Sequence, residues 1–208
     1  MRTTIKLLTV LALALATFSQ QITASAGDIW KVERWSADAY LVTTDPSGCI
    51  STSVSVYVED FVEGSSGPGN PKSRAILRIY RFDECTHTVL MDAGGFASLA
   101  DPNFQVSTNL DSATLNATVH VQDFVSNSSF DVLVDLTWTG TSSLHHDNTQ
   151  YQVGGPGCHY ISQEITAFRD ADVAGTVSAG ETDFISGASV NYATISLTKS
   201  RNIAVGCD

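Results

Sequence analysis

The stretch that decides the fold spans residues 115–138 and reads LNATVHVQDFVSNSSFDVLVDLTW. Apolar and polar residues alternate one by one from Leu115 to Val121, and again from Val132 to Trp138 except at Leu133. A period of two residues is typical of a β-strand with one face on a core, because successive side chains point to opposite faces. The polar segment between the two runs is typical of a tight turn. The stretch therefore predicts a β-hairpin whose apolar face, Trp138 included, lies in the core.

The same alternation recurs elsewhere, and one recurrence indicates a duplication. Residues 40–62 read YLVTTDPSGCISTSVSVYVEDFV, residues 104–125 read FQVSTNLDSATLNATVHVQDFV, and both end in Asp-Phe-Val. A strand-like segment follows each copy. A lone two-stranded hairpin is marginal in water, so the two copies are expected to pack together and share a core. We predict an all-β fold, a β-sandwich or barrel-like sheet built from a duplicated β unit.

The segment 160–169 fits two kinds of structure. Ile161, Ile165 and Phe168 fall at helical spacing. The neighbouring residues alternate as strands do, and 173–177 continues that pattern. We predict a strand here.

The N-terminus has the features of an export signal. Arg2 and Lys6 precede an almost wholly apolar run over 7–18, and the small residues Ala-Ser-Ala end at Ala26. A run of about a dozen apolar residues is too short to span a bilayer, which takes roughly 20. We predict a signal peptide over 1–26 and a secreted protein, extracellular or periplasmic.

Residues 27–208 are predicted to form a single all-β domain with an internal repeat, about 38–101 and 102–208. The whole chain has 22 acidic and 11 basic residues, a formal net charge of −11 at pH 7. This balance argues against nucleic-acid binding, which needs clusters of Lys and Arg for the phosphates. No second long apolar run occurs, so no stable membrane span is expected. The expected partner is an unknown extracellular ligand, and no cofactor is predicted.

Four cysteines are expected to form disulfides, because an even number of cysteines in an exported protein usually indicates disulfide bonds. They are Cys49, Cys85, Cys158 and Cys207. Four cysteines allow three connectivities. We favour Cys49–Cys85 and Cys158–Cys207, since each pair would close a loop within one half of the duplication.

The histidines are the first candidates for a metal site. His145 and His146 are consecutive, and His159 follows about a dozen residues later. Imidazole suits zinc or copper. Neighbours in a strand point to opposite faces, so the first two histidines would need a loop to act together, and the polar and glycine residues over 148–154 favour one. The alternative is that all three are exposed polar residues.

Three tyrosines are candidates for stacking on a ligand. Tyr57 lies on an alternating polar face, and Tyr151 and Tyr160 flank a glycine-rich segment. Aromatic side chains offer a large apolar surface with a polar tip, which suits sugar or peptide binding. The alternative for each is ordinary packing.

No catalytic set can be assembled from the sequence. Ser196 and Lys199 satisfy Ser-x-x-Lys, but positions i and i+3 of a strand face opposite sides. Asp60 and Asp123 occupy equivalent places in the two copies, which favours a structural role at strand ends over a pair of acid catalysts.

Part of the chain resembles a known group of proteins. Residues 113–144, ATLNATVHVQDFVSNSSFDVLVDLTWTGTSSL, with residues 174–184, AGTVSAGETDF, are similar to a group of secreted bacterial β-proteins of unknown function. The resemblance implies secretion and β structure, and it brings no activity or site residues. We therefore expect a secreted, non-catalytic β protein that binds an extracellular ligand or serves at the cell envelope. The alternative is a small secreted hydrolase, or a metal-binding protein, using the region of His145, His146 and His159.

Overall fold

The computed structural model describes residues 26–64, 71–100, 103–155 and 158–205, and these residues form strands and turns with no helix among them. The strands are β1 (Ala26–Thr44), β2 (Ile50–Gly64), β3 (Pro71–Asp83), β4 (Thr88–Leu99), β5 (Phe104–Val106), β6 (Ser112–Asp123), β7 (Ser128–Gly140), β8 (His145–Gly155), β9 (Cys158–Ala179), β10 (Thr182–Asp183) and β11 (Ser189–Val205). The prediction of an all-β fold is confirmed. None of the described segments is a helix long and apolar enough to cross a membrane.

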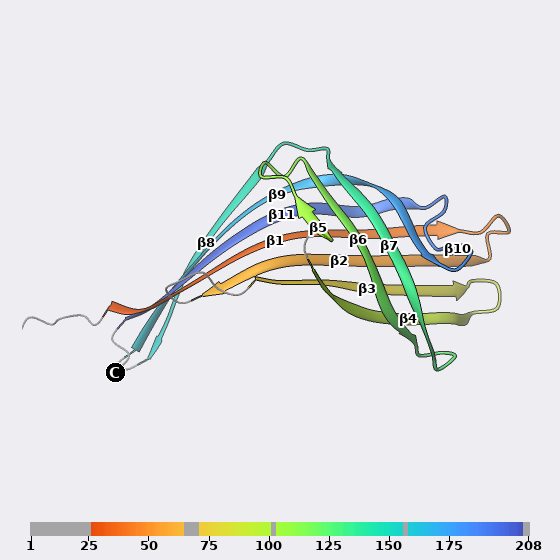
Figure 1. The fold of residues 1–208 in the computed structure, drawn as a ribbon, viewed down its shortest axis with the longest axis horizontal. Helices are drawn as coiled ribbons and strands as arrows, with labels where there is room; N and C mark the ends of the chain where they lie inside the picture. Colours follow the sequence, from red (N-terminus) through yellow and green to blue (C-terminus); the bar gives the residue numbers. More distant parts are fainter. Residues whose placement is uncertain (1–25, 65–70, 101–102, 156–157, 206–208) are drawn as a thin grey trace, which may run out of the picture.

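All strands belong to one antiparallel sheet that closes into a ring (Figure 1). The closing strand is β9, because its two halves pair with different neighbours. Its first half pairs with β11 and ends with Asp170 opposite Thr194, whereas its second half pairs with β7 from Ala171 onward. The β6–β7 hairpin crosses the other strands steeply, and β8, β9, β11 and β1 extend beyond it. The result is a ring-like sheet without the symmetry of a regular barrel.

The core lies on the inner face of this ring, which we define as the face that carries the fully buried apolar side chains. The alternation predicts it correctly, since Val54, Val119 and Val132 are each 0% exposed. Trp138 is also fully buried, as predicted, and its indole Nε1 donates a hydrogen bond to the backbone carbonyl of Asp38 at 2.7 Å. That bond satisfies the one polar atom of the ring. It also ties β7 to β1 across the interior.

Two glycines allow the β6–β7 hairpin to lie close to the strands on either side of it, β4 and β9. A Cβ placed on Gly95 in β4 would lie 2.0 Å from the carbonyl oxygen of His120 in β6. A Cβ on Gly175 in β9 would lie 2.0 Å from the carbonyl oxygen of Asp135 in β7, and Gly175 also has a φ of +133°. Only glycine fits such an approach. The contacts of the hairpin with β4 and with β9 therefore each depend on a glycine.

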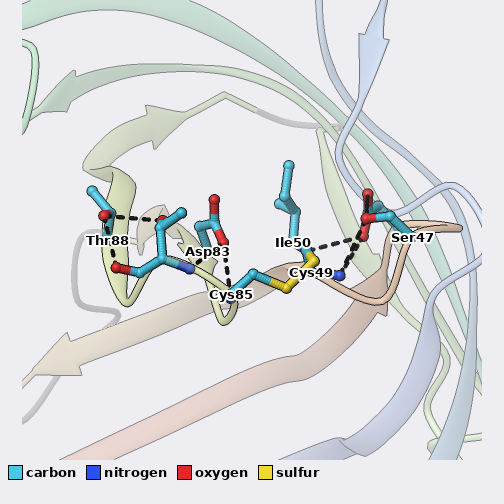
Figure 2. Close-up of a disulfide and its surroundings, with 8 residues drawn as sticks. Ser47, Cys49, Ile50, Asp83, Cys85 and Thr88 are labelled. Atoms are coloured by element: carbon cyan, nitrogen blue, oxygen red, sulfur yellow. Dashed lines mark hydrogen bonds between the residues drawn. A yellow bond between two sulfur atoms is a disulfide. The ribbon is translucent and has the colours of Figure 1, made fainter.

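A disulfide joins the β1–β2 turn to the β3–β4 turn (Figure 2). It links Cys49 to Cys85, as predicted, with the two Cα atoms 5.3 Å apart. Each turn is also held by an aspartate. Asp45 Oδ1 accepts hydrogen bonds from the backbone N–H groups of Cys49 and Ile50. Asp83 Oδ1 accepts a hydrogen bond from the backbone N–H of Cys85. The hydroxyl of Ser47 also donates to Asp45, and the backbone N–H of Thr86 donates to Asp83. These two bonds are the largest cause of the lowered pKa of each aspartate, because hydrogen bonds favour the carboxylate form.

The remaining cysteine pair and the export signal fall outside the described residues. The structure gives no side chain for Cys158 and does not describe Cys207, so their pairing stays a prediction. Residues 1–25 are likewise outside the described ranges, and the signal peptide stays a prediction.

Two local predictions have opposite outcomes. The segment 160–169 lies within β9, so the prediction of a strand there is confirmed. The prediction of a loop over 148–154 is wrong, because these residues belong to β8. The physical reason is that β8 pairs with the first half of β9 along its whole length, which supplies partners for backbone groups that would otherwise form an open sheet edge.

The duplication stays a prediction, and its two Asp-Phe-Val sequences have different surroundings. The first lies inside β2, whereas in the second only Asp123 belongs to a strand, β6. Asp123 is 4% exposed and accepts hydrogen bonds from the backbone N–H groups of Val125 and Asp92, which is the structural role predicted for it. Asp60 instead accepts a hydrogen bond from the hydroxyl of Ser73 at 2.6 Å.

Candidate functional site

A polar groove lies on the outer face of the sheet, across strands that are far apart in the sequence. It crosses β9, β11, β1 and β2, and its cavity volume is about 430 Å³. We call it the outer groove. Its lining alternates along each strand with residues of the inner face, so the groove and the core are formed by opposite faces of the same strands.

Strand register aligns the groove residues in rows. One row runs Phe168, Ser196, Ser36 from β9 through β11 to β1. The next row on one side holds Asp170, Thr194 and Asp38, and the next on the other side holds Thr166, Thr198 and Arg34. Directly opposed side chains in a sheet lie about 4.5–5.5 Å apart at Cβ. Five of these nine residues carry hydroxyl groups, so the floor of the groove is a ladder of serine and threonine.

The hydroxyl groups of the floor are paired with one another. The Oγ atoms of Ser36 and Ser196 are 2.8 Å apart, and the Oγ1 atoms of Thr166 and Thr198 are 3.3 Å apart. Ser36 and Thr198 are both buried. A hydroxyl has one donor and two acceptor positions, so each pair keeps acceptor capacity that a ligand can use.

Asp38 is the carboxyl group at one side of this floor. Its Oδ1 accepts hydrogen bonds from the backbone N–H and the hydroxyl of Thr194, at 3.0 and 2.8 Å. Burial raises the pKa of Asp38 because it disfavours the charged form, and the bonds from Thr194 oppose that effect without cancelling it. Asp38 is therefore a partly desolvated carboxyl group facing a cavity.

Glu59 is buried next to the groove, which is unusual for a carboxylate on an outer face. It is 2% exposed. It accepts hydrogen bonds from Arg74 Nε and from the hydroxyl of Tyr57, the latter at 2.6 Å, and Arg34 Nη1 lies 3.9 Å from it. Buried charges are stable only when they are paired in this way. Burial and the neighbouring Glu59 raise the pKa of Tyr57 to about 12.

Arg34 has an unused donor at the groove. Its Nε is buried and has no hydrogen-bond partner among the described residues. An unpaired buried N–H costs about 1–3 kcal/mol.

Aromatic rings border the polar floor. Phe168 lies at one end, stacked with His145 of β8 at a ring-centroid distance of 5.3 Å and an interplanar angle of 23°. Tyr57 and Tyr192 line the groove on its other sides, and Tyr192 is 54% exposed. The groove thus combines a hydroxyl floor with apolar aromatic faces.

The structure brings some of the predicted site residues together and separates others. Tyr57 lines the groove, and His145 borders it through Phe168. Tyr151 lies on the same face of β8, opposite Ser162, but farther along the strand. His146 follows His145 in the same strand and points to the other face.

The metal hypothesis finds no support in the described part of the chain. No group of three or more histidine, cysteine, aspartate or glutamate side chains gathers there in a way that could hold a metal ion. The side chains of His159 and Tyr160 are outside what the structure describes, so their predicted roles stay untested. Ser196 lies on the outer face and Lys199 on the inner face, as expected for positions i and i+3 of a strand.

Sequence reasoning missed the floor of the groove. A signal for it is present in β11, where Thr194, Ser196, Thr198 and Ser200 alternate with other residues. Such a strand has a continuous hydroxyl face. The contribution of β1 carried no comparable signal, because Ser36 and Asp38 resemble ordinary solvent-facing residues.

Comparisons with known proteins do not assign a family. No protein family and no curated protein matches the chain. Among solved structures, the chain is similar to a candidate AttH protein from Nitrosomonas europaea, with 12% identity over 86% of this chain and 52% of that one, and a TM-score of 0.31. The chain thus spans about half the length of that protein. It is also similar to the enduracididine biosynthesis enzyme MppR, with 7% identity over 89% and 90% of the two chains and a TM-score of 0.16. Similarity at this level does not place the chain in a family.

Proposed function

We propose that this chain is a secreted, non-catalytic binding protein whose outer groove takes a polyhydroxylated ligand, an oligosaccharide. The observation that carries the proposal is the groove itself, in which the paired hydroxyls of Ser36 and Ser196 form a floor between the rings of Phe168 and Tyr192. Its volume of about 430 Å³ lies in the usual range for small-molecule sites, about 300–1,000 Å³.

The chemistry of a sugar matches both parts of the groove. A sugar ring presents hydroxyls at its edge and C–H groups on its faces. The edge hydroxyls can donate to the free acceptor positions of the serine and threonine floor. The faces can pack on Tyr192, whose ring is exposed and whose phenol can stay in water.

Two charged residues give the groove polarity. Asp38 supplies carboxyl oxygens and Arg34 supplies its guanidinium group, on the outer face of β1 with Ser36 between them. Hydrogen bonds to charged groups are stronger than those between neutral groups, contributing about 1.5–3 kcal/mol. These two residues are therefore expected to orient the ligand.

Two acidic groups at the groove are already engaged by neighbouring side chains. Glu59 is held by Arg74 and Tyr57 and is 2% exposed, so it is committed to a structural network. Asp38 is bonded to Thr194. A glycosidase needs two carboxyl groups that flank the scissile bond. Asp170, which shares the row of Asp38 and Thr194, and Glu164 also line the groove, so hydrolysis of a bound sugar is tested directly below.

The experiment is a binding screen with the secreted, oxidised protein on an array of defined oligosaccharides from glucan, mannan, xylan, chitin and peptidoglycan. A sugar that binds is then measured by isothermal titration. We expect Tyr192→Ala to weaken its binding by tenfold or more, about 1.4 kcal/mol. Phe124→Ala is the matched control, because Phe124 is an aromatic residue 65% exposed in the β6–β7 turn, outside the groove.

Three results would overturn the proposal. The first is that no sugar binds at millimolar concentration, and the second is that Tyr192→Ala and Phe124→Ala bind equally well. The third is hydrolysis of the bound sugar that is lost in Asp38→Asn, which would make the protein an enzyme. The proposed secretion is tested by mass spectrometry, because the exported protein should have the mass of residues 27–208. A mass that still includes residues 1–26 would refute secretion.

A further inference from the structure

A second cavity lies on the inner face, in the part of the sheet that extends beyond the β6–β7 hairpin. Its volume is about 580 Å³, and it is lined by residues of β1, β9 and β11 with Asp60 of β2. Figure 1 shows these strands continuing past β6 and β7. We call it the inner cavity. It shares no lining residue with the outer groove.

The inner cavity is apolar at one end. Trp35 lies there, half-buried, on the same face as the core and directly opposite Leu197 and Asp60. A smaller hollow of about 160 Å³ adjoins this end and adds Phe104 and Val106. Asp60 is engaged by the hydroxyl of Ser73. The end at Trp35 therefore offers the apolar side chains of Trp35, Phe104 and Val106 beside the hydrogen-bonded carboxyl group of Asp60.

The inner cavity is basic at its other end. Lys31 of β1 and Arg201 of β11 are directly opposed in the register, on the face that lines the cavity. Like charges at opposed positions of a sheet destabilise it. Neither side chain has an ion-pair partner among the described residues. The two cations are thus available to an anion.

The middle of the cavity is electrically balanced. Glu33 and Lys199 are opposed in the row between Trp35 and Lys31, and Lys199 Nζ lies 3.4 Å from Glu33 Oε2. Ile165 is opposite Lys199 and adds apolar surface to this row. The cavity therefore changes from apolar to neutral to basic along the strands.

We infer that the inner cavity binds a single-chain amphiphile with a carboxylate head, that is, a free fatty acid. The alkyl chain would lie on Ile165 and Trp35, and the carboxylate would lie between Lys31 and Arg201. The guanidinium group of arginine matches a carboxylate in a two-pronged arrangement. Burial of the alkyl chain favours binding in proportion to the apolar surface that it removes from water. This site is independent of the proposed sugar-binding function.

The test uses dodecanoate, below its micelle concentration, with the full oxidised protein in isothermal titration. Dodecanol tests the alkyl chain without the charge, and acetate tests the charge without the chain. We expect dodecanoate to bind at least tenfold more tightly than dodecanol, and acetate not to bind at millimolar concentration. The tryptophan fluorescence of the protein should change when dodecanoate binds, and this change should be absent in Trp35→Phe.

Matched variants locate the head group. Arg201→Gln should weaken dodecanoate binding by tenfold or more and leave dodecanol binding unchanged. Arg78→Gln removes the same charge from an arginine that is 64% exposed in its side chain and pairs with Asp92 on the outer face of the sheet. It should bind dodecanoate as the unchanged protein does. Urea unfolding of both variants confirms that they are folded.

Four outcomes would overturn the inference. They are the absence of dodecanoate binding, equal affinity for dodecanoate and dodecanol, equal weakening by Arg201→Gln and Arg78→Gln, and a native mass showing that a second copy covers the cavity. Failure of the sugar screen would leave this inference intact, because the two sites share no residue.

Discussion

Replacing Gly95 of β4 with alanine tests how the ring is closed between β4 and β6. Gly95 is paired with Val121, and a Cβ on it would lie 2.0 Å from the carbonyl oxygen of His120. Ordinary contact begins at 3.4 Å. The backbones of β4 and β6 must therefore separate by roughly 1 Å or more to admit a methyl group.

The cost follows from what that separation breaks. β4 and β6 are joined by three residue pairs, Ala93–Asp123, Gly94–Gln122 and Gly95–Val121. Each backbone hydrogen bond lost costs about 1 kcal/mol, and overpacking alone costs about 1–3 kcal/mol. We expect Gly95→Ala to lower the free energy of unfolding by about 3 kcal/mol. For a chain of this size that lowers Tm by about 6–12 °C.

The neighbouring glycine provides the control. A Cβ on Gly94 would lie 3.8 Å from the carbonyl oxygen of Leu77 and 3.9 Å from the ring of Phe124, which is ordinary contact. Gly94→Ala should change the free energy of unfolding by less than about 1 kcal/mol, because alanine also restricts the unfolded chain. The assay is urea unfolding followed by tryptophan fluorescence, with the disulfide intact. If the two variants unfold within about 1 kcal/mol of each other, the close approach at Gly95 does not hold the ring together.

Three further predictions concern the disulfide, the buried tryptophan and the groove carboxyl group. Replacing Cys49 and Cys85 together with alanine should lower the free energy of unfolding by about 4 kcal/mol, since the bond joins residues 36 apart; an unchanged urea midpoint would contradict this. Trp138→Phe should cost about 1–3 kcal/mol, because it leaves the buried carbonyl of Asp38 without its donor, and a cost below about 0.5 kcal/mol in the same assay would show that water replaces the indole. The pKa of Asp38 is raised in the folded protein, so the folded chain keeps this proton at pH values where the unfolded chain has lost it. The contribution of Asp38 to the free energy of unfolding therefore falls as the pH rises from 3.8, its ordinary pKa, through its raised pKa. Asp38→Asn should flatten that part of the stability–pH curve, and a curve with the same slope would refute the raised pKa.

The sequence predicted the strands well because a buried face imposes a period of two on them. Val119 and Val132 were placed on the core by alternation alone, and both are fully buried. Trp138 was placed there by the same rule. The prediction of a loop over 148–154 was wrong because polarity reports solvent exposure, whereas β8 is a strand through its pairing with β9.

The candidate site was only partly predictable. Tyr57 was singled out as a stacking candidate and His145 as a metal candidate, and the structure places the first in the outer groove and the second at its border. Ser36 and Ser196 are 160 residues apart, and their contact depends on β11 pairing with β1. Period-two alternation within one strand does not say which strand lies beside it.

The sequence by itself determined the class of structure, the faces of the strands and the pairing of Cys49 with Cys85 as the favoured connectivity. The first two are local properties set by alternation. The cysteine pairing was favoured because both residues lie in one half of the predicted duplication. The tertiary structure alone decided that β9 closes the ring, that its two halves pair with different strands, and that two cavities lie on opposite faces of β1. Those features depend on register between distant strands, which is fixed by how the whole core packs rather than by any one segment.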